Sequence, residues 1–352
     1  MAKLKNKIKE LYNKNYKFLL LIPAILLVLS LVYLGYFYNK NHDFILKDVS
    51  LKGGITITIF PEQIINLKSL EEKLSINFED FSLKEISEFG TGKQTAVVVE
   101  IPSENPDSLE YDSLINILED HLKYDLIKGK NFDIVSTGST LGKSFYNQLI
   151  YAIVLSFSFM SVVVLFIFGK SWKLKLFFLF IILLPVILFF SGAFKINIAM
   201  GISAIFLILS VLIFLKINIP SAAVVISAFA DIIMSLAVVD LLGIKLSGAG
   251  IIAFLMLIGY SVDTDIMLTA RLLKRHGDIN HKLKNALKTG LTMGITSILA
   301  ITAALIITSS FSEVLRQIFT ILIIGLSFDI INTWITNASI LKWYLEAKEK
   351  AK

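Results

Sequence analysis

Long apolar segments separated by short basic ones make up most of the chain, and one long polar stretch interrupts them near the N-terminus. An α-helix needs roughly 20 apolar residues to cross the hydrocarbon core of a bilayer, and each segment has about that length. The pattern therefore predicts a polytopic α-helical membrane protein with eight spans. They are expected near residues 18–38, 148–169, 174–194, 198–217, 222–242, 250–273, 289–308 and 318–341.

The polar stretch at residues 39–145 has the pattern of a separate α+β domain, and it holds 18 of the 28 acidic residues. Alternating apolar positions predict strands, and apolar positions three or four apart predict helices. Strands are expected at 54–60, 76–86, 93–101 and 131–135, and helices at 61–74 and 106–123. This βαββαβ order predicts a ferredoxin-like domain. The domain shows no nucleophile, paired acids or ligand cluster, so we expect it to bind or to couple motion.

Composition narrows the function further. Hydrophobic residues make up 55% of the chain, above the roughly 45–50% of soluble proteins. The chain has no cysteine, which excludes disulfides and thiolate metal sites, and its four histidines are scattered. We therefore expect no catalytic residues, no cofactor and no metal, and we do not expect an enzyme.

The basic residues indicate how the chain lies in the membrane. They gather before the first expected span and after the second, fourth, sixth and eighth. Cytoplasmic loops carry an excess of Lys and Arg, so residues 1–17 and 342–352 are expected in the cytoplasm and residues 39–145 outside the cytoplasmic membrane. The net charge of +6 is then explained by the lipid bilayer and not by nucleic acid.

Four aspartates lie deep inside apolar segments: Asp231, Asp263, Asp265 and Asp329. An ionised carboxylate at the centre of a bilayer costs on the order of 2.5 kcal/mol or more, so such acids are functional candidates. Three helices are expected to bring these acids to similar depth, as sites of ion coupling or of contact between helices. Asp240 lies near the end of a span, where solvation at the interface is expected.

Asp263 and Asp265 cannot line the same side of one helix. Residues two apart on an α-helix point about 200° away from each other. Asp265 shares a stripe with Ser261 and Thr269, which can donate hydrogen bonds to it. Asp263 shares its face with the small residue Gly259, which allows a partner helix to come close. The pattern alone leaves open which of the two acids works.

Two glycine-containing stretches are expected to be structural. The stretch 138–144, GSTLGKS, is similar to a phosphate-binding loop, but three residues separate its glycines where that motif has four. Nucleotide binding is therefore not expected. Close packing of helices is expected from Gly243, Gly248, Gly250 and Gly259.

Several stretches together resemble the SecF protein-export family of the RND superfamily, in its archaeal branch. They are residues 259–271 (GYSVDTDIMLTAR), 48–57 (DVSLKGGITI), 139–142, 230–231 and 328–344 (FDIINTWITNASILKWY). The resemblance covers nearly the whole chain except residues 172–218. It implies an RND-type helix bundle with one external domain. It also marks Gly259, Tyr260 and Ser261 as motif and packing residues.

The chain departs from the family pattern in two places. The family typically has six spans, so the hairpin at 174–217 resembles an insertion and is expected to face lipid at the periphery. In the bacterial pattern an acid stands where this chain has Thr264, and an arginine stands where this chain has Thr292. The proton relay attributed to the bacterial proteins therefore carries over only in part.

The resemblance implies a non-enzymatic subunit that works with SecD beside the Sec translocon channel and assists a translocating polypeptide, coupled to an ion gradient. Asp263 stands eight residues before Arg271, as the comparable acid does in SecD, and is favoured as the coupling acid. Asp231, Asp263 and Asp329 are expected to face SecD. Arg271 is expected to anchor the helix at the interface. The alternatives are a static assembly subunit and an exporter of small molecules or lipids.

Overall fold

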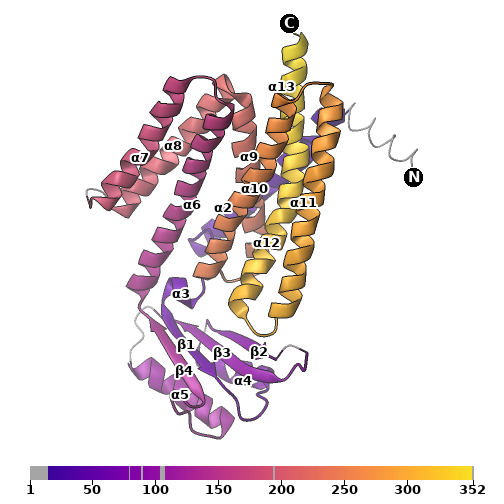
Figure 1. Cartoon of the computed structure of the whole chain (residues 1–352). Helices are drawn as coiled ribbons and strands as arrows, with labels where there is room; N and C mark the ends of the chain where they lie inside the picture. Colours follow the sequence, from indigo (N-terminus) through magenta and orange to yellow (C-terminus); the bar gives the residue numbers. More distant parts are fainter. Residues whose placement is uncertain (1–14, 79, 89, 104–107, 193–194, 351–352) are drawn as a thin grey trace.

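The computed structural model describes residues 15–78, 80–88, 90–103, 108–192 and 195–350. Most of them form a bundle of long helices, and a small α/β domain lies beyond one end of the bundle (Figure 1). Within the described residues, eight helical segments are long and apolar enough to cross a membrane. The predicted fold class, a polytopic helical membrane protein with a separate α/β domain, is confirmed.

Six of these segments contain one regular helix: α6 (Ser139–Phe168), α7 (Trp172–Phe190), α8 (Ile196–Ile217), α9 (Ile219–Leu241), α10 (Gly248–Lys274) and α11 (Ile279–Thr308). The first segment, Asn15–Asn41, joins helical residues 15–19 to α2 (Leu21–Asn41), and the eighth contains three elements. The last segment joins α12 (Glu313–Ile331), the π-helix η1 (Asn332–Asn337) and α13 (Ala338–Lys350). It extends beyond the predicted 318–341 because its polar ends stay helical outside the apolar core.

Helix α6 also begins earlier than predicted, at Ser139 and not at residue 148. Gly138 is its N-cap residue, so the GSTLGKS stretch continues directly into helix. A Cβ added to Gly142 would lie 2.9 Å from the backbone oxygen of Leu51, so glycine is needed for α6 to contact the short helix α3 (Val49–Lys52). This stretch is a helix start, and it does not form a phosphate-binding loop.

The α/β domain has the ferredoxin-like topology that the sequence predicts. Its elements are β1 (Gly54–Ile59), α4 (Leu67–Ser75), β2 (Ser82–Ser87), β3 (Gln94–Pro102), α5 (Ser108–Leu122) and β4 (Phe132–Thr137). The sheet order is β2-β3-β1-β4, and all three pairings are antiparallel. Alternate residues of β1 and β3 are buried against leucines of α4 and α5, so the domain has its own core.

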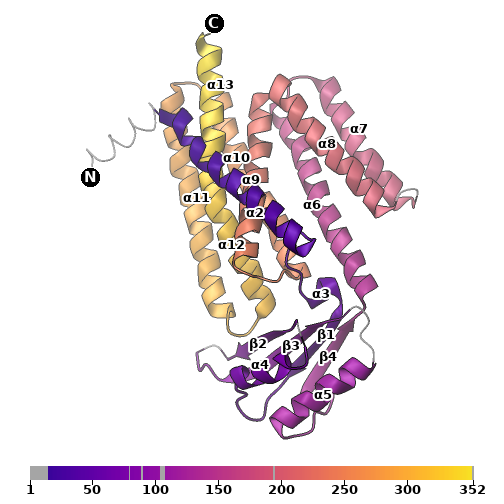
Figure 2. The ribbon, with the colours of Figure 1, turned by 180° about the vertical axis from the view of Figure 1, so that it is seen from behind.

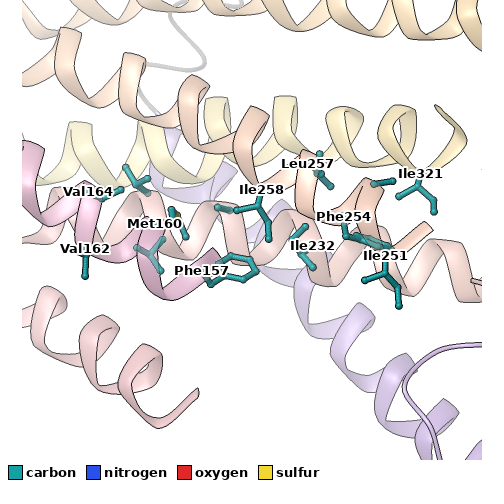
Figure 3. Packing of buried hydrophobic residues seen from close by; sticks show 14 of the residues in the cluster. Phe157, Met160, Val162, Val164, Ile232, Ile251, Phe254, Leu257, Ile258 and Ile321 are labelled. Carbon is teal, nitrogen blue, oxygen red and sulfur yellow. The ribbon is translucent and has the colours of Figure 1, made fainter. Parts of the chain in front are cut away.

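Helix α9 is the centre of the bundle. Of its most apolar stretch 72% is buried, against 6% for α11. Close to α9, apolar side chains of α6 and α10 interdigitate, among them Phe157, Met160, Phe254 and Ile258 (Figure 3). Helices α7 and α8 lie on the outer side of α6, and α2 crosses the bundle obliquely (Figures 1 and 2). Helix α9 is in contact with α2, α6, α8, α10 and α12, which places it at the centre of the bundle.

Close helix approach occurs at some of the predicted glycines and not at others. A Cβ on Gly248 would lie 2.7 Å from Phe145, and a Cβ on Gly250 would lie 2.7 Å from Leu246. Among the described residues, no heavy atom lies within 4 Å of a Cβ added to Gly243 or Gly259, so close packing at these two glycines stays a prediction. Tighter contacts occur at Gly290, against Trp334, and at Gly325, against Leu257.

We predict that Gly325→Ala destabilises the bundle by roughly 1–3 kcal/mol, the usual cost of overpacking a core. Its Cβ would lie 2.2 Å from Leu257, which is fully buried. Thermal unfolding of the purified protein in detergent measures this effect. The matched control is Gly35→Ala in α2, where an added Cβ meets nothing within 4 Å. Equal unfolding temperatures for the two variants would contradict the packing.

Candidate functional site in the membrane helices

Three aspartates from three helices meet in the interior of the bundle. Asp231 of α9 and Asp265 of α10 are fully buried, and Asp329 of α12 is 2% exposed. Thr333 contacts both Asp265 and Asp329, and Asn332 beside it donates to Asp231. Among the described residues, no basic side chain forms an ion pair with any of the three acids. The cluster is therefore a set of buried carboxyls held by neutral donors.

Asp231 has a donor for each of its two oxygens. Its Oδ1 accepts a hydrogen bond from Asn332 Nδ2 at 2.7 Å, and its Oδ2 accepts one from Ser261 Oγ at 2.6 Å. Ser261 belongs to α10 and Asn332 to η1, so the carboxyl ties three helical elements together. Buried carboxylates need such partners, because the loss of water is otherwise uncompensated. Asp231 is thus satisfied as an acceptor.

Asp265 is satisfied at one oxygen only. Its Oδ1 lies 2.8 Å from Asn337 Nδ2, 2.9 Å from Thr333 Oγ1 and 3.4 Å from Ser227 Oγ. Its Oδ2 is buried and has no hydrogen-bond partner, and the same holds for Oδ1 of Asn337. Asp265 Oδ2 and Asn337 Oδ1 are thus two buried acceptors without a donor. A proton on Asp265 would supply one, since a protonated carboxyl is itself a donor.

The hydroxyl of Thr333 gives a second reason for a bound proton. It lies 2.9 Å from Asp265 Oδ1 and 3.0 Å from Asp329 Oδ1. A hydroxyl has one hydrogen to donate, so it can serve only one of these acceptors. The other contact is a hydrogen bond only when that carboxyl carries a proton and donates it. Both contacts can be two-centre hydrogen bonds only when Asp265 or Asp329 carries a proton.

The π-helix η1 places the donors around the acids. In an α-helix, residues five positions apart point about 140° away from each other. Asn332 and Asn337 are five apart, yet both are fully buried and both donate into the cluster. A π-turn, with hydrogen bonds five residues apart, brings such positions to one side, and π-turns inside α-helices are frequent at functional sites. The irregular turn is part of the site.

Asp265 lies inside the bundle and Asp263 lies outside it, whereas the sequence favoured Asp263 as the coupling acid. Asp263 lies on the exposed side of α10 and outside the cluster, and Gly259 and Tyr260 are exposed as well. Of the three acids expected to face SecD, Asp231 and Asp329 are instead buried inside the bundle together with Asp265, and only Asp263 lies at the surface. The physical reason is the helix period, which turns Asp265 inward when Asp263 faces out.

Other predicted residues lie where they cannot serve the cluster. Thr292 of α11 is exposed, and its hydroxyl donates to the backbone oxygen of Lys288 at 2.8 Å. Arg271 binds α11 through the Asn285 oxygen and the Thr289 hydroxyl, and it contacts neither acid of α10. Asp240, which was expected to be solvated, is only 3% exposed and accepts from the Leu46 amide at 3.3 Å.

Four residues of the site were not singled out from the sequence: Ser227, Asn332, Thr333 and Asn337. Their signal was the presence of amides and hydroxyls inside otherwise apolar spans, since such groups can hydrogen-bond between membrane helices. Among the described residues, no group of three or more His, Cys, Asp or Glu side chains has the arrangement of a metal site.

We predict that Thr333→Val destabilises the bundle by about 1–3 kcal/mol, the cost of leaving buried acceptors without a donor. Valine keeps the shape of threonine and removes only the hydroxyl that contacts Asp265 and Asp329. The matched control is Thr302→Val in α11, since that hydroxyl donates to the backbone of its own helix. Thermal unfolding in detergent measures both variants. Two equal, small losses would contradict the bridging role.

This chain is similar to known protein-export membrane proteins. The profile of the family described as protein export membrane protein SecD/SecF, C-terminal, matches residues 190–347. The protein-export membrane protein SecF of Methanocaldococcus jannaschii is 31% identical over 94% of this chain and 96% of its own length. The SecF of Methanothermobacter thermautotrophicus is 32% identical over 95% and 94%. The SecF of Pyrococcus furiosus is 29% identical over 98% and 97%.

A solved structure shares the fold. The crystal structure of SecDF, a translocon-associated membrane protein from Thermus thermophilus, matches with a TM-score of 0.59 and 14% sequence identity. The match covers 95% of this chain and 38% of the SecDF chain, so this chain spans less than half of that protein. The full-length relatives settle the family: the chain belongs to the SecF family of protein-export membrane proteins.

Proposed function

We propose that this chain is a non-enzymatic accessory subunit of the Sec machinery, which works with SecD beside the translocon channel and assists polypeptides across the cytoplasmic membrane. The observation that carries this proposal is the near full-length similarity to relatives named protein-export membrane protein SecF. The buried acid cluster and the small α/β domain are the two parts that the mechanism uses.

SecD is the expected partner because the acid Asp263 is exposed on the surface of a membrane-spanning helix and needs a protein partner. Asp263 lies on the outer face of α10 together with Met256, Gly259 and Tyr260. A carboxylate that faces lipid is costly, whereas one that faces another protein can be paired. The SecDF chain is much longer than the part that this chain matches. We propose that SecD packs against this face and that Asp263 lies at the interface between the two proteins.

The coupling role then falls to the inward acids. Asp265 has a buried oxygen without a partner, and Thr333 connects it to Asp329. Binding or release of a proton changes which carboxyl donates and which accepts. Moving one charge across about 100 mV supplies ~2.3 kcal/mol, which is enough to bias a two-state arrangement of helices. We therefore propose Asp265, and not Asp263, as the coupling acid.

A static role is the second candidate, and a specific observation favours it. Both oxygens of Asp231 have donors from other helical elements, which is the pattern of a carboxyl that only holds helices together. In that case the subunit stabilises its partners and moves no ion. Dependence of export on the ion gradient separates the two candidates.

The orientation proposed from the basic residues fits the shape of the molecule. The α/β domain lies at one end of the bundle, and α13 and the loop before α11 lie at the other end (Figure 1). Both termini would be cytoplasmic and residues 39–145 external, so that the domain meets the polypeptide as it emerges.

Single cysteines test this orientation, because the natural chain has none. We predict that a membrane-impermeant maleimide applied from outside labels Ser103→Cys in intact cells. His281→Cys, which is exposed beyond the other end of the bundle, is labelled only after the membrane is opened. Labelling of both cysteines in intact cells would reject the orientation.

Two matched substitutions test the roles of the acids. We predict that Asp265→Asn still co-purifies with SecD but loses the gradient-dependent part of export, because asparagine cannot bind and release the proton. Asp263→Asn should instead reduce the recovery of SecD. Both are measured by affinity purification and by export with and without an uncoupler. Wild-type export in Asp265→Asn cells would rule out coupling through this acid, and failed assembly would favour the static role.

A further inference from the structure

The α/β domain joins the membrane bundle at one narrow place. Gly54, the first residue of β1, is paired with Thr137, the last residue of β4. The chain therefore enters the domain after Gly53 and leaves it at Gly138, from the same end of two neighbouring strands. Both covalent connections share one pivot.

Glycines allow the two connections to touch. Gly53 has a φ of 94°, in the left-handed region that favours glycine, and a Cβ there would lie 2.6 Å from the Cα of Ser139. Gly138 precedes α6 and has nothing within 4 Å of an added Cβ. The two connections therefore lie close together, and neither Gly53 nor Gly138 places a side chain between them.

The opposite edge of the sheet is held by polar contacts. Strand β2 is separated from β1 by β3. At its end the Ser87 amide donates to the backbone oxygen of Ser310, in the loop between α11 and α12, at 2.6 Å. Lys84 of β2 lies 3.5 Å from Glu313 at the start of α12. Both contacts cross between the two parts of the molecule.

A further ion pair completes this set of contacts, which we call the latch: Ser87 with Ser310, Lys84 with Glu313, and Asp80 with Lys245. The Lys245 ammonium, in the loop before α10, lies 2.7 Å from Asp80 Oδ1. Partial burial of Asp80 opposes its ionisation, but Lys245 and Lys52 outweigh burial and lower the pKa of Asp80.

The junction between the two parts is loosely packed. A cavity of about 400 Å³ lies between β2 and the ends of the membrane helices, lined by Ser82, Lys84, Lys245, Glu313 and Gln317, among others. Among the described residues, the apolar core of the domain and that of the bundle are separate clusters. Because no shared apolar core fixes the domain, its docking depends on the contacts at the pivot and on the latch.

We propose that the α/β domain is a hinged body, with its pivot at Gly53, Gly54 and Gly138, and that the latch holds it closed until its polar contacts part. Helix α12 connects the latch to the acid cluster, because it carries Glu313 at one end and Asp329 at the other. Gln317 of the same helix donates to the Lys245 oxygen at 2.6 Å. This connection rests on the proposed function, whereas the hinge itself does not.

Distances between spin labels test the hinge in the full-length protein, since the chain has no cysteine of its own. One pair of labels, at Lys93→Cys and Val314→Cys, reports on the latch side, and both residues are exposed. The other pair, at Val135→Cys and Leu141→Cys, reports on the pivot, and these residues are exposed as well. Pulsed electron paramagnetic resonance measures both distances in lipid nanodiscs.

The latch is weakened by the double substitution Asp80→Asn and Glu313→Gln, which leaves Lys84 its partner Glu100. The control is Asp120→Asn, whose ion pairs with Lys73 and Lys123 lie inside the domain. We expect the population with a longer latch-side distance to rise on the order of tenfold in the double variant and to stay unchanged in the control. The pivot distance should not change.

High salt provides a second measurement that needs no substitution, because screening weakens exposed ion pairs. It should raise the same long-distance population in the wild-type chain. A latch-side distance that responds neither to the substitutions nor to salt would overturn the hinge, and so would an equal change at the pivot. The readout involves no export, so failure here leaves the proposed function standing.

Discussion

The structure depends on one constraint: three carboxyls are buried among membrane helices, and no described basic residue pairs with them. Each needs neutral donors, and these come from α10, α9 and η1. The contacts of Thr333 are complete only when a proton is present. We propose that this proton is part of the structure of the cluster, because its removal would leave adjacent buried acceptors without a donor.

The same constraint accounts for the irregular last span. A regular helix would place Asn332 and Asn337 on different sides, and one of the two acids that they serve would lose its donor. The π-turn costs some helical regularity and places both amides inside. Helix α12, just before this turn, continues to the latch contacts of Glu313. A change in the cluster and a change at the junction therefore act on one continuous helical segment.

The fold was largely predictable from the sequence, because apolar length determines spans and the order of periodic segments determines the domain. The site was predictable only in part. The polar positions inside the spans marked Asp231, Asp265 and Asp329, but the preference for Asp263 rested on the small residues of its helix face and on the resemblance to SecD. Which face of α10 points inward depends on packing against α9 and α12. The π-turn has no periodicity signal, so the roles of Asn332 and Asn337 could not be predicted.

The central claim is that a proton is bound within the cluster at neutral pH, on Asp265, whose second oxygen has no partner. Infrared difference spectroscopy of the purified protein detects the carbonyl stretch of a protonated carboxyl directly. The account predicts such a band at neutral pH, which disappears in Asp265→Asn and persists in Asp263→Asn. A spectrum with only ionised carboxylates at neutral pH would contradict it.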